Sequence, residues 1–114
     1  MKDPESIPLE KLLNQISGKW TVYILWILDT NGRLRFGELR RKIDGISTKV
    51  LTERLQMLEE IGIVNRHYKP TIPPQVTYEL SDRGKELSKP LYQLCDLASD
   101  WYGNEIVSIV NKHY

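Results

Sequence analysis

The stretch STKVLTERLQMLEEI, residues 47–61, decides how the rest of the chain folds. Within it, Leu51, Leu55 and Leu58 recur at helical spacing, which predicts a helix with one apolar face packed on a core. Ser47 is a good N-cap for this helix, because its hydroxyl can accept a hydrogen bond from a backbone N–H of the first turn. The other face carries side chains that can hydrogen-bond to base edges: Lys49, Thr52, Glu53 and Gln56.

A shorter amphipathic segment, FGELRRKI at residues 36–43, precedes this helix, and DGI at residues 44–46 separates the two. Two short helices joined by a tight turn with glycine are typical of a helix-turn-helix, here about residues 36–61, whose second helix enters the major groove. The alternative is a helical hairpin that only packs on a core. Local charge favours DNA: residues 33–54 contain seven basic and three acidic residues, a net charge of +4, whereas the whole chain carries +1.

The segment that follows is predicted to be a β-hairpin, about residues 63–80. A strand is expected from Ile63 to about Tyr68, and VTYEL at residues 76–80 alternates in side-chain character as a returning strand does. Three prolines within residues 69–75 exclude a helix or a central strand and predict a stiff tip. A hairpin in this position is the wing of a winged helix, and the alternative is a two-stranded cap on the core. The predicted fold class is mainly α with a small β-hairpin (α+β), a three-helix core plus a wing.

Further helices are expected on both sides of this unit. Residues 8–16 carry an apolar stripe, and residues 19–28 are apolar on nearly all sides, which predicts a buried central helix with Ser17 as its cap. A last helix is expected over about residues 82–112, kinked or restarted at Pro90. It carries more apolar surface than a small domain hides, so we expect a homodimer; folding back within one chain is the alternative. The residues expected at that interface are Leu9, Leu13, Leu91, Leu94, Ala98, Trp101, Ile106 and Ile109.

The expected contacts with double-stranded DNA divide into base-reading and phosphate-holding residues. For any single arginine, a solvated surface charge is the alternative. Base edges are expected to meet Thr48, Lys49, Thr52, Glu53 and Gln56, and phosphates to meet Ser47, Arg35, Arg40, Arg41, Arg66 and Lys69.

Composition and scattered reactive residues exclude several other classes. The 114 residues, 40% hydrophobic and 27% charged, suit one globular domain. No apolar run approaches the roughly 18–20 residues that span a bilayer, and the N-terminus does not resemble a signal peptide. One cysteine forms no internal disulfide, which favours the cytoplasm. His67, His113 and Cys95 are too scattered for a metal site or a catalytic pair, so we expect no cofactor, no metal and no enzyme. The serious alternative to DNA binding is an adaptor that uses a winged helix for protein–protein contact.

Several motifs, in order and spacing, resemble the HxlR-type family of winged-helix transcriptional regulators, distantly related to the MarR group. They are GKW at residues 18–20, RLRFGELRRKIDGIS at residues 33–47 and PPQVTYEL at residues 73–80. The resemblance covers roughly residues 16–95 and implies a homodimeric bacterial or archaeal regulator, with one recognition helix per subunit in each half-site. Many relatives have a cysteine before the first helix where this chain has Ile7, so their redox sensing is not carried over.

Two features leave the regulation of such a protein open. Cys95 lies in the predicted last helix, where a lone cysteine usually serves as a small core residue. A small-molecule effector pocket lined by Trp20, Tyr23, Trp26 and Trp101 is conceivable near the helical interface, but such residues more often just fill a core.

Overall fold

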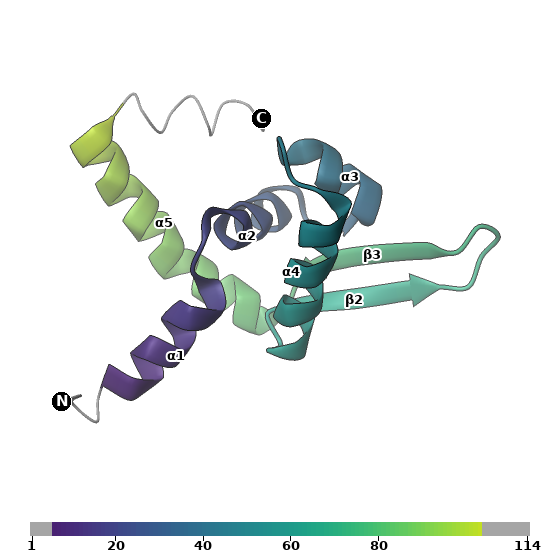
Figure 1. Ribbon diagram of the computed structural model, residues 1–114, viewed down its shortest axis with the longest axis horizontal. Helices are drawn as coiled ribbons and strands as arrows, with labels where there is room; N and C mark the ends of the chain where they lie inside the picture. Colours follow the sequence, from purple (N-terminus) through teal and green to yellow (C-terminus); the bar gives the residue numbers. More distant parts are fainter. Residues whose placement is uncertain (1–5, 104–114) are drawn as a thin grey trace.

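The computed structural model describes residues 6–103, which form five helices and a three-stranded sheet (Figure 1). In chain order the elements are α1 (Ser6–Ile16), α2 (Lys19–Asn31), β1 (Leu34–Arg35), α3 (Phe36–Lys42), α4 (Thr48–Glu60), β2 (Val64–Lys69), β3 (Gln75–Leu80) and α5 (Asp82–Tyr102). Elements α2 to β3 make a winged helix, to which α1 and α5 add one helix at each end. The α+β prediction is confirmed. Within the described part of the chain, no helix is both long and apolar enough to cross a membrane.

Helix α2 is the centre of the core. Ile24, Leu25 and Leu28 are at most 1% exposed, because α3, α4, α5 and the sheet surround this helix. The prediction that Ser17 caps α2 is wrong. The backbone N–H of Ser17 still bonds to Leu13 at the end of α1, and the N-cap is Gly18, without a side-chain hydrogen bond. Gly18 turns the chain between the helices at a φ of 98°, which a residue with a side chain resists.

Helices α3 and α4 form the predicted helix-turn-helix. Leu39 and Ile43 on the α3 side are at most 1% exposed, as is Leu55 of α4, so the two helices share the core. The turn between them passes through Gly45 at a φ of 81°. Ser47 caps α4 as predicted: its hydroxyl oxygen accepts a hydrogen bond from the backbone N–H three residues on, at 3.1 Å.

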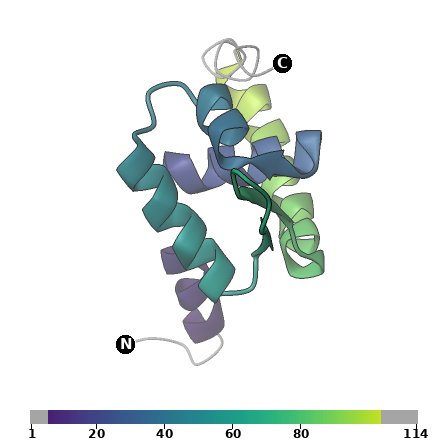
Figure 2. The same cartoon turned by 90° about the vertical axis from the view of Figure 1, so that its right-hand side faces the viewer.

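The sheet is antiparallel, with strand order β1-β3-β2. In β2 and β3, Val64 pairs with Leu80 at the base and Lys69 with Gln75 at the far end, where residues 70–74 close the loop. Both base residues are buried, whereas the far end of the hairpin projects from the body as a wing (Figure 1) and points toward the viewer in Figure 2. The third strand, β1, pairs with the middle of β3.

The start of α5 packs closely on the turn that precedes β2. The Ser81 hydroxyl donates to the Gly62 carbonyl oxygen at 2.6 Å and accepts from the Gly84 backbone N–H at 3.1 Å. A Cβ at Gly84 would lie only 2.3 Å from the carbonyl oxygen of Ile63, so only glycine allows this approach. The first turn of α5 is therefore fixed to the winged helix.

Beyond this first turn, α5 runs as one helix from Asp82 to Tyr102, so of the two predicted alternatives at Pro90, a kink or a restart, the restart is excluded. Pro90 leaves the carbonyl of Glu86 without its helical donor, but both residues are exposed and water can take the donor's place. Gly103 caps the helix, and the remainder of the predicted range to residue 112 lies outside the described residues. In Figure 1, α1 and α5 diverge on the side of the molecule opposite the wing.

Candidate nucleic-acid interface

Helix α4 presents its polar face to solvent. Its apolar face is fully buried, with Leu51 and Leu58 at 0% exposure. The spacing of the leucines predicts one apolar and one polar face, and the structure shows the first buried and the second exposed. The residues predicted to meet base edges are all exposed: Thr48, Lys49, Thr52, Glu53 and Gln56.

Two hydroxyl groups on this face have defined hydrogen-bonding roles. The Ser47 oxygen accepts from the Val50 backbone N–H, which leaves its own hydrogen to donate outward, for example to a phosphate oxygen. The Thr52 hydroxyl donates to the Thr48 carbonyl at 2.8 Å, so toward a groove it offers an acceptor and a methyl group. An acceptor suits the exposed amino groups of adenine or cytosine, and a methyl group suits the methyl of thymine.

The charge along α4 sets which end approaches nucleic acid. Lys49 lies in the first turn, while Glu59 and Glu60 are exposed in the last. The N-terminal end of a helix also carries the positive end of its dipole. Phosphates are therefore attracted to the start of α4 and repelled from its end.

Basic side chains gather next to the start of α4. The last turn of α3 contains Arg40, Arg41 and Lys42, and both arginines are exposed. Arg35, also exposed, precedes α3, where its backbone N–H donates to the Glu38 carboxylate at 2.9 Å. These three arginines are available to phosphate.

The wing does not bring its predicted phosphate-binding residues together on one face. Side chains alternate along a strand, so Arg66 and Lys69 of β2 lie on opposite faces of the hairpin. Arg66 pairs with Tyr78, whose face continues into the core, and its guanidinium lies 6.0 Å from the Tyr68 ring. Arg35 and Lys69 share the other face. Both wing residues are nevertheless exposed, Lys69 at the projecting end and Arg66 in the middle of β2.

On the face of the sheet that carries Arg35 and Lys69, Glu79 of β3 contacts both β2 and the residue that precedes β1. Its carboxylate receives hydrogen bonds from Arg33 at 3.2 and 3.3 Å and contacts the His67 ring nitrogen Nε2 at 2.9 Å. These hydrogen bonds hold the pKa of Glu79 below its ordinary value. Because its charge is paired with Glu79, Arg33 contributes less than the other arginines to the positive charge available for phosphate. The partners are 46 and 12 residues apart, and no sequence signal indicated the contact.

The residues predicted to form a dimer interface lie on α1 and α5, away from the wing. The exposed fractions are 56% for Leu9, 50% for Leu13, 61% for Leu94 and 68% for Trp101. Leu91 instead packs partly on the core, and Ala98 is half-buried. Ile106 and Ile109 lie outside the described residues.

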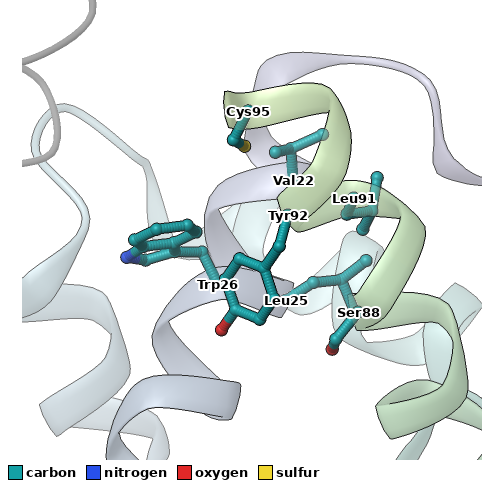
Figure 3. Close-up of a pocket in the computed structure, with 7 residues that line it drawn as sticks. All are labelled: Val22, Leu25, Trp26, Ser88, Leu91, Tyr92 and Cys95. Atoms are coloured by element: carbon teal, nitrogen blue, oxygen red, sulfur yellow. The ribbon is translucent and has the colours of Figure 1, made fainter. Parts of the chain in front are cut away.

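The aromatic residues considered for an effector pocket are divided between contacts and solvent. Trp20 contacts Tyr23 edge to face at 6.2 Å between ring centroids, Trp26 contacts Tyr92 of α5 at 5.0 Å, and Trp101 is exposed. A small cavity does lie between α2 and α5 (Figure 3). It holds about 10 Å³, room for at most one water molecule.

Cys95 lines this cavity from α5 (Figure 3). Burial, and the nearby charge of Asp96, raise the pKa of its thiol above the ordinary value. A protonated thiol is a weak nucleophile, so this environment suits a packing role. Among the described residues, no three His, Cys, Asp or Glu side chains gather as metal ligands would.

An exposed polar helix, flanked by free arginines and followed by a projecting hairpin, defines a winged helix-turn-helix protein of the DNA-binding class. The comparisons with known proteins identify the family. The HxlR-like helix-turn-helix pattern matches residues 15–106, and the chain belongs to this family of DNA-binding transcriptional regulators.

Relatives and solved structures agree with this assignment. The chain is 40% identical over 98 residues to an HTH-type transcriptional regulator of Synechocystis, covering 86% of this chain and 72% of that protein. It is also 40% identical over 105 residues to the regulator YtcD of Bacillus subtilis, covering 92% and 79%. A crystal structure from Enterococcus faecalis, assigned to the MarR family, has a TM-score of 0.77 at 33% identity and covers 92% of this chain and 94% of its own.

Proposed function

We propose that this regulator acts as a homodimer that recognises specific duplex DNA. The start of α4 enters the major groove in each half-site, Arg40 and Arg41 hold the flanking phosphates, and the wing lies on the adjacent backbone. Base edges are read by Lys49, Thr52 and Gln56. The family relationship supports the DNA-binding part of this proposal, and the exposed surfaces support the rest.

One observation carries the proposal: the polar face of α4 is exposed to solvent and does not pack on the rest of the described chain. Thr48, Lys49 and Gln56 are exposed, while the apolar face of the same helix is fully buried. Arg40 and Arg41 are in the last turn of α3, which residues 43–47 join to the positive end of α4. An adaptor that binds other proteins has no need of this arrangement.

The dimer is inferred from the apolar surface on α1 and α5. Ile7, Leu9 and Leu13 of α1 are each at least half exposed, and so are Leu94 and Trp101 of α5. Monomeric proteins rarely expose apolar side chains in such groups, which mark interfaces. A second copy supplies a matching surface by symmetry.

The proposal assigns binding, not catalysis, to this chain, and places it in the cytoplasm because a regulator of prokaryotic genes acts where the chromosome is. The 10 Å³ cavity between α2 and α5 has no room for a small-molecule effector in this conformation. An open groove of about 770 Å³ between α1 and the start of α5 is large enough to hold one.

Selection of duplexes from a random-sequence pool tests the proposed function. The expected result is enrichment of a site with two related half-sites about 10 base pairs apart, as two copies of one helix require. A gel shift should then show one complex whose affinity falls steeply with salt. Failure to enrich any sequence, together with no shift in dilute salt, would leave the adaptor role as the better explanation.

A further inference from the structure

The tip of the wing is apolar and unusually exposed. Ile72 is fully exposed, at 101% of its reference area, and Tyr68 on β2 is exposed to 57%. Three prolines, at positions 70, 73 and 74, surround Ile72 in the loop. Since β2 and β3 have six residues each, about 20 Å of strand carries this tip away from the body (Figure 1). A single exposed aliphatic side chain is ordinary, but an apolar end on a projecting arm is not.

The loop also holds Ile72 in a defined place. The Thr71 backbone N–H donates to the Lys69 carbonyl at 2.8 Å, and the Thr71 hydroxyl donates to the Pro73 carbonyl at 2.8 Å. The prolines restrict φ on both sides of Ile72. A tip already ordered in this way loses little conformational entropy when it binds.

The charge around the tip selects the partner. No aspartate or glutamate occurs from Ile61 to Tyr78, while Arg66 and Lys69 occur within this stretch and both are exposed. An apolar tip made for a protein partner has no reason to exclude acids over 18 residues. A groove lined by phosphates on both sides does impose that exclusion, and it attracts the two cations.

We propose that Ile72 is an apolar wedge that enters the minor groove beside the α4 half-site, parts a base step and bends the duplex. This inference rests on the DNA binding proposed above and adds the residue that deforms the DNA. Apolar wedges of this size are used by proteins that kink DNA from the minor groove. Pyrimidine–purine steps unstack most readily, so the wedge favours sites with such a step under the tip, at a position that no side chain reads directly.

The test uses the full chain and a duplex that it enriches from a random pool. Bending is measured with circularly permuted duplexes, and unstacking with 2-aminopurine placed along the site. The wild-type protein is expected to bend the duplex by about 20–90° and to raise 2-aminopurine fluorescence at one step per half-site. Ile72→Ala should reduce both signals and weaken binding about tenfold, because the buried apolar contact is lost. Ile72→Leu should retain all three.

Lys69→Ala is the matched control, because it changes charge three residues away and leaves the wedge in place. It should weaken specific and nonspecific DNA about equally and lower the salt slope by about one per subunit, while the bend stays. Ile72→Ala should leave the salt slope unchanged. If Ile72→Ala binds and bends the selected duplex as the wild type does, the wedge is wrong although the regulator role stands. If the wild type enriches no duplex at all, it is the proposed function that fails.

Discussion

Helices α4 and α5 begin alike and differ in what covers them. Each starts with a serine cap: Ser47 and Ser81 both accept a hydrogen bond from the backbone N–H three residues on, at 3.1 Å. Each is amphipathic. Yet α4 buries its whole apolar face, whereas α5 buries Leu87 to 8% exposure and leaves Leu94 at 61%.

The difference shows that an amphipathic pattern predicts which face of a helix will be buried, but not which segment or partner will bury it. The apolar face of α4 meets α2 and β2 within the same chain. The start of α5 is bonded to the turn before β2, its middle packs on α2, and then the helix leaves the body (Figure 1). The polar face of α4 and the apolar face of α5 both remain exposed, and the proposed function assigns the first to DNA and the second to another copy of the chain.

The largest expected effect comes from removing the packing of α4. Leu55→Ala should lower the free energy of unfolding by about 2–5 kcal/mol, because it opens a cavity at a side chain of 1% exposure. Urea denaturation followed by circular dichroism measures this loss. Gln56→Ala, one residue along on the exposed face, is the control and should change stability by less than about 0.5 kcal/mol. Equal losses in the two variants would contradict the two-faced description of α4.

The next effect concerns the uncovered face of α5. Leu94→Asp should weaken dimerisation by about 2 kcal/mol or more, roughly thirtyfold in the dissociation constant, because a charge replaces an apolar contact. Analytical ultracentrifugation over a concentration series measures it. Gln93→Asp adds the same charge at the neighbouring exposed position and should leave the dimer intact. A wild-type protein that stays monomeric at high concentration would show that another partner covers α5.

A smaller effect is expected on the polar face of α4. Lys49→Ala or Gln56→Ala should weaken binding to the selected duplex by about 1–3 kcal/mol and flatten the preference at one base position. Fluorescence anisotropy with single-base variants of the site measures both quantities. Glu60→Ala, at the acidic end of the same helix, should bind at least as tightly as the wild type. Unchanged affinity in both first variants would mean that a different face of α4 meets the bases.

The smallest effect concerns the sheet that connects the two helices. Arg33 and His67 hold the pKa of Glu79 below its ordinary value of 4.5, so the charged form stabilises the folded state. This contribution is present above pH 4.5 and is lost as the pH falls through the lower folded-state pKa. Glu79→Gln should therefore cost at most about 1 kcal/mol near neutral pH, since the groups are partly exposed. Denaturation at neutral and acidic pH should show the two proteins converging in acid; a gap that stays constant with pH would refute the ionic origin.

Local patterns in the sequence predicted the helix-turn-helix and the faces of α4 correctly. The spacing of Leu51, Leu55 and Leu58 and the cap at Ser47 depend only on neighbours within a few residues, so the sequence contains them in full. The hairpin was equally predictable, because prolines and alternation mark its tip and its strands. The cap of α2 was mispredicted, since Ser17 and Gly18 are both plausible until the angle between α1 and α2 is known.

By itself, the sequence determined the order of the elements, the two faces of α4 and the concentration of basic residues beside it, because helical periodicity, capping and charge are short-range properties. The tertiary structure decided which faces stay open and paired the middle of β3 with β1 as well as with β2. It also joined Arg33 to Glu79 across 46 residues and kept α5 continuous through Pro90. These outcomes depend on strand register and on solvent access at each position, which are fixed only when distant segments pack together.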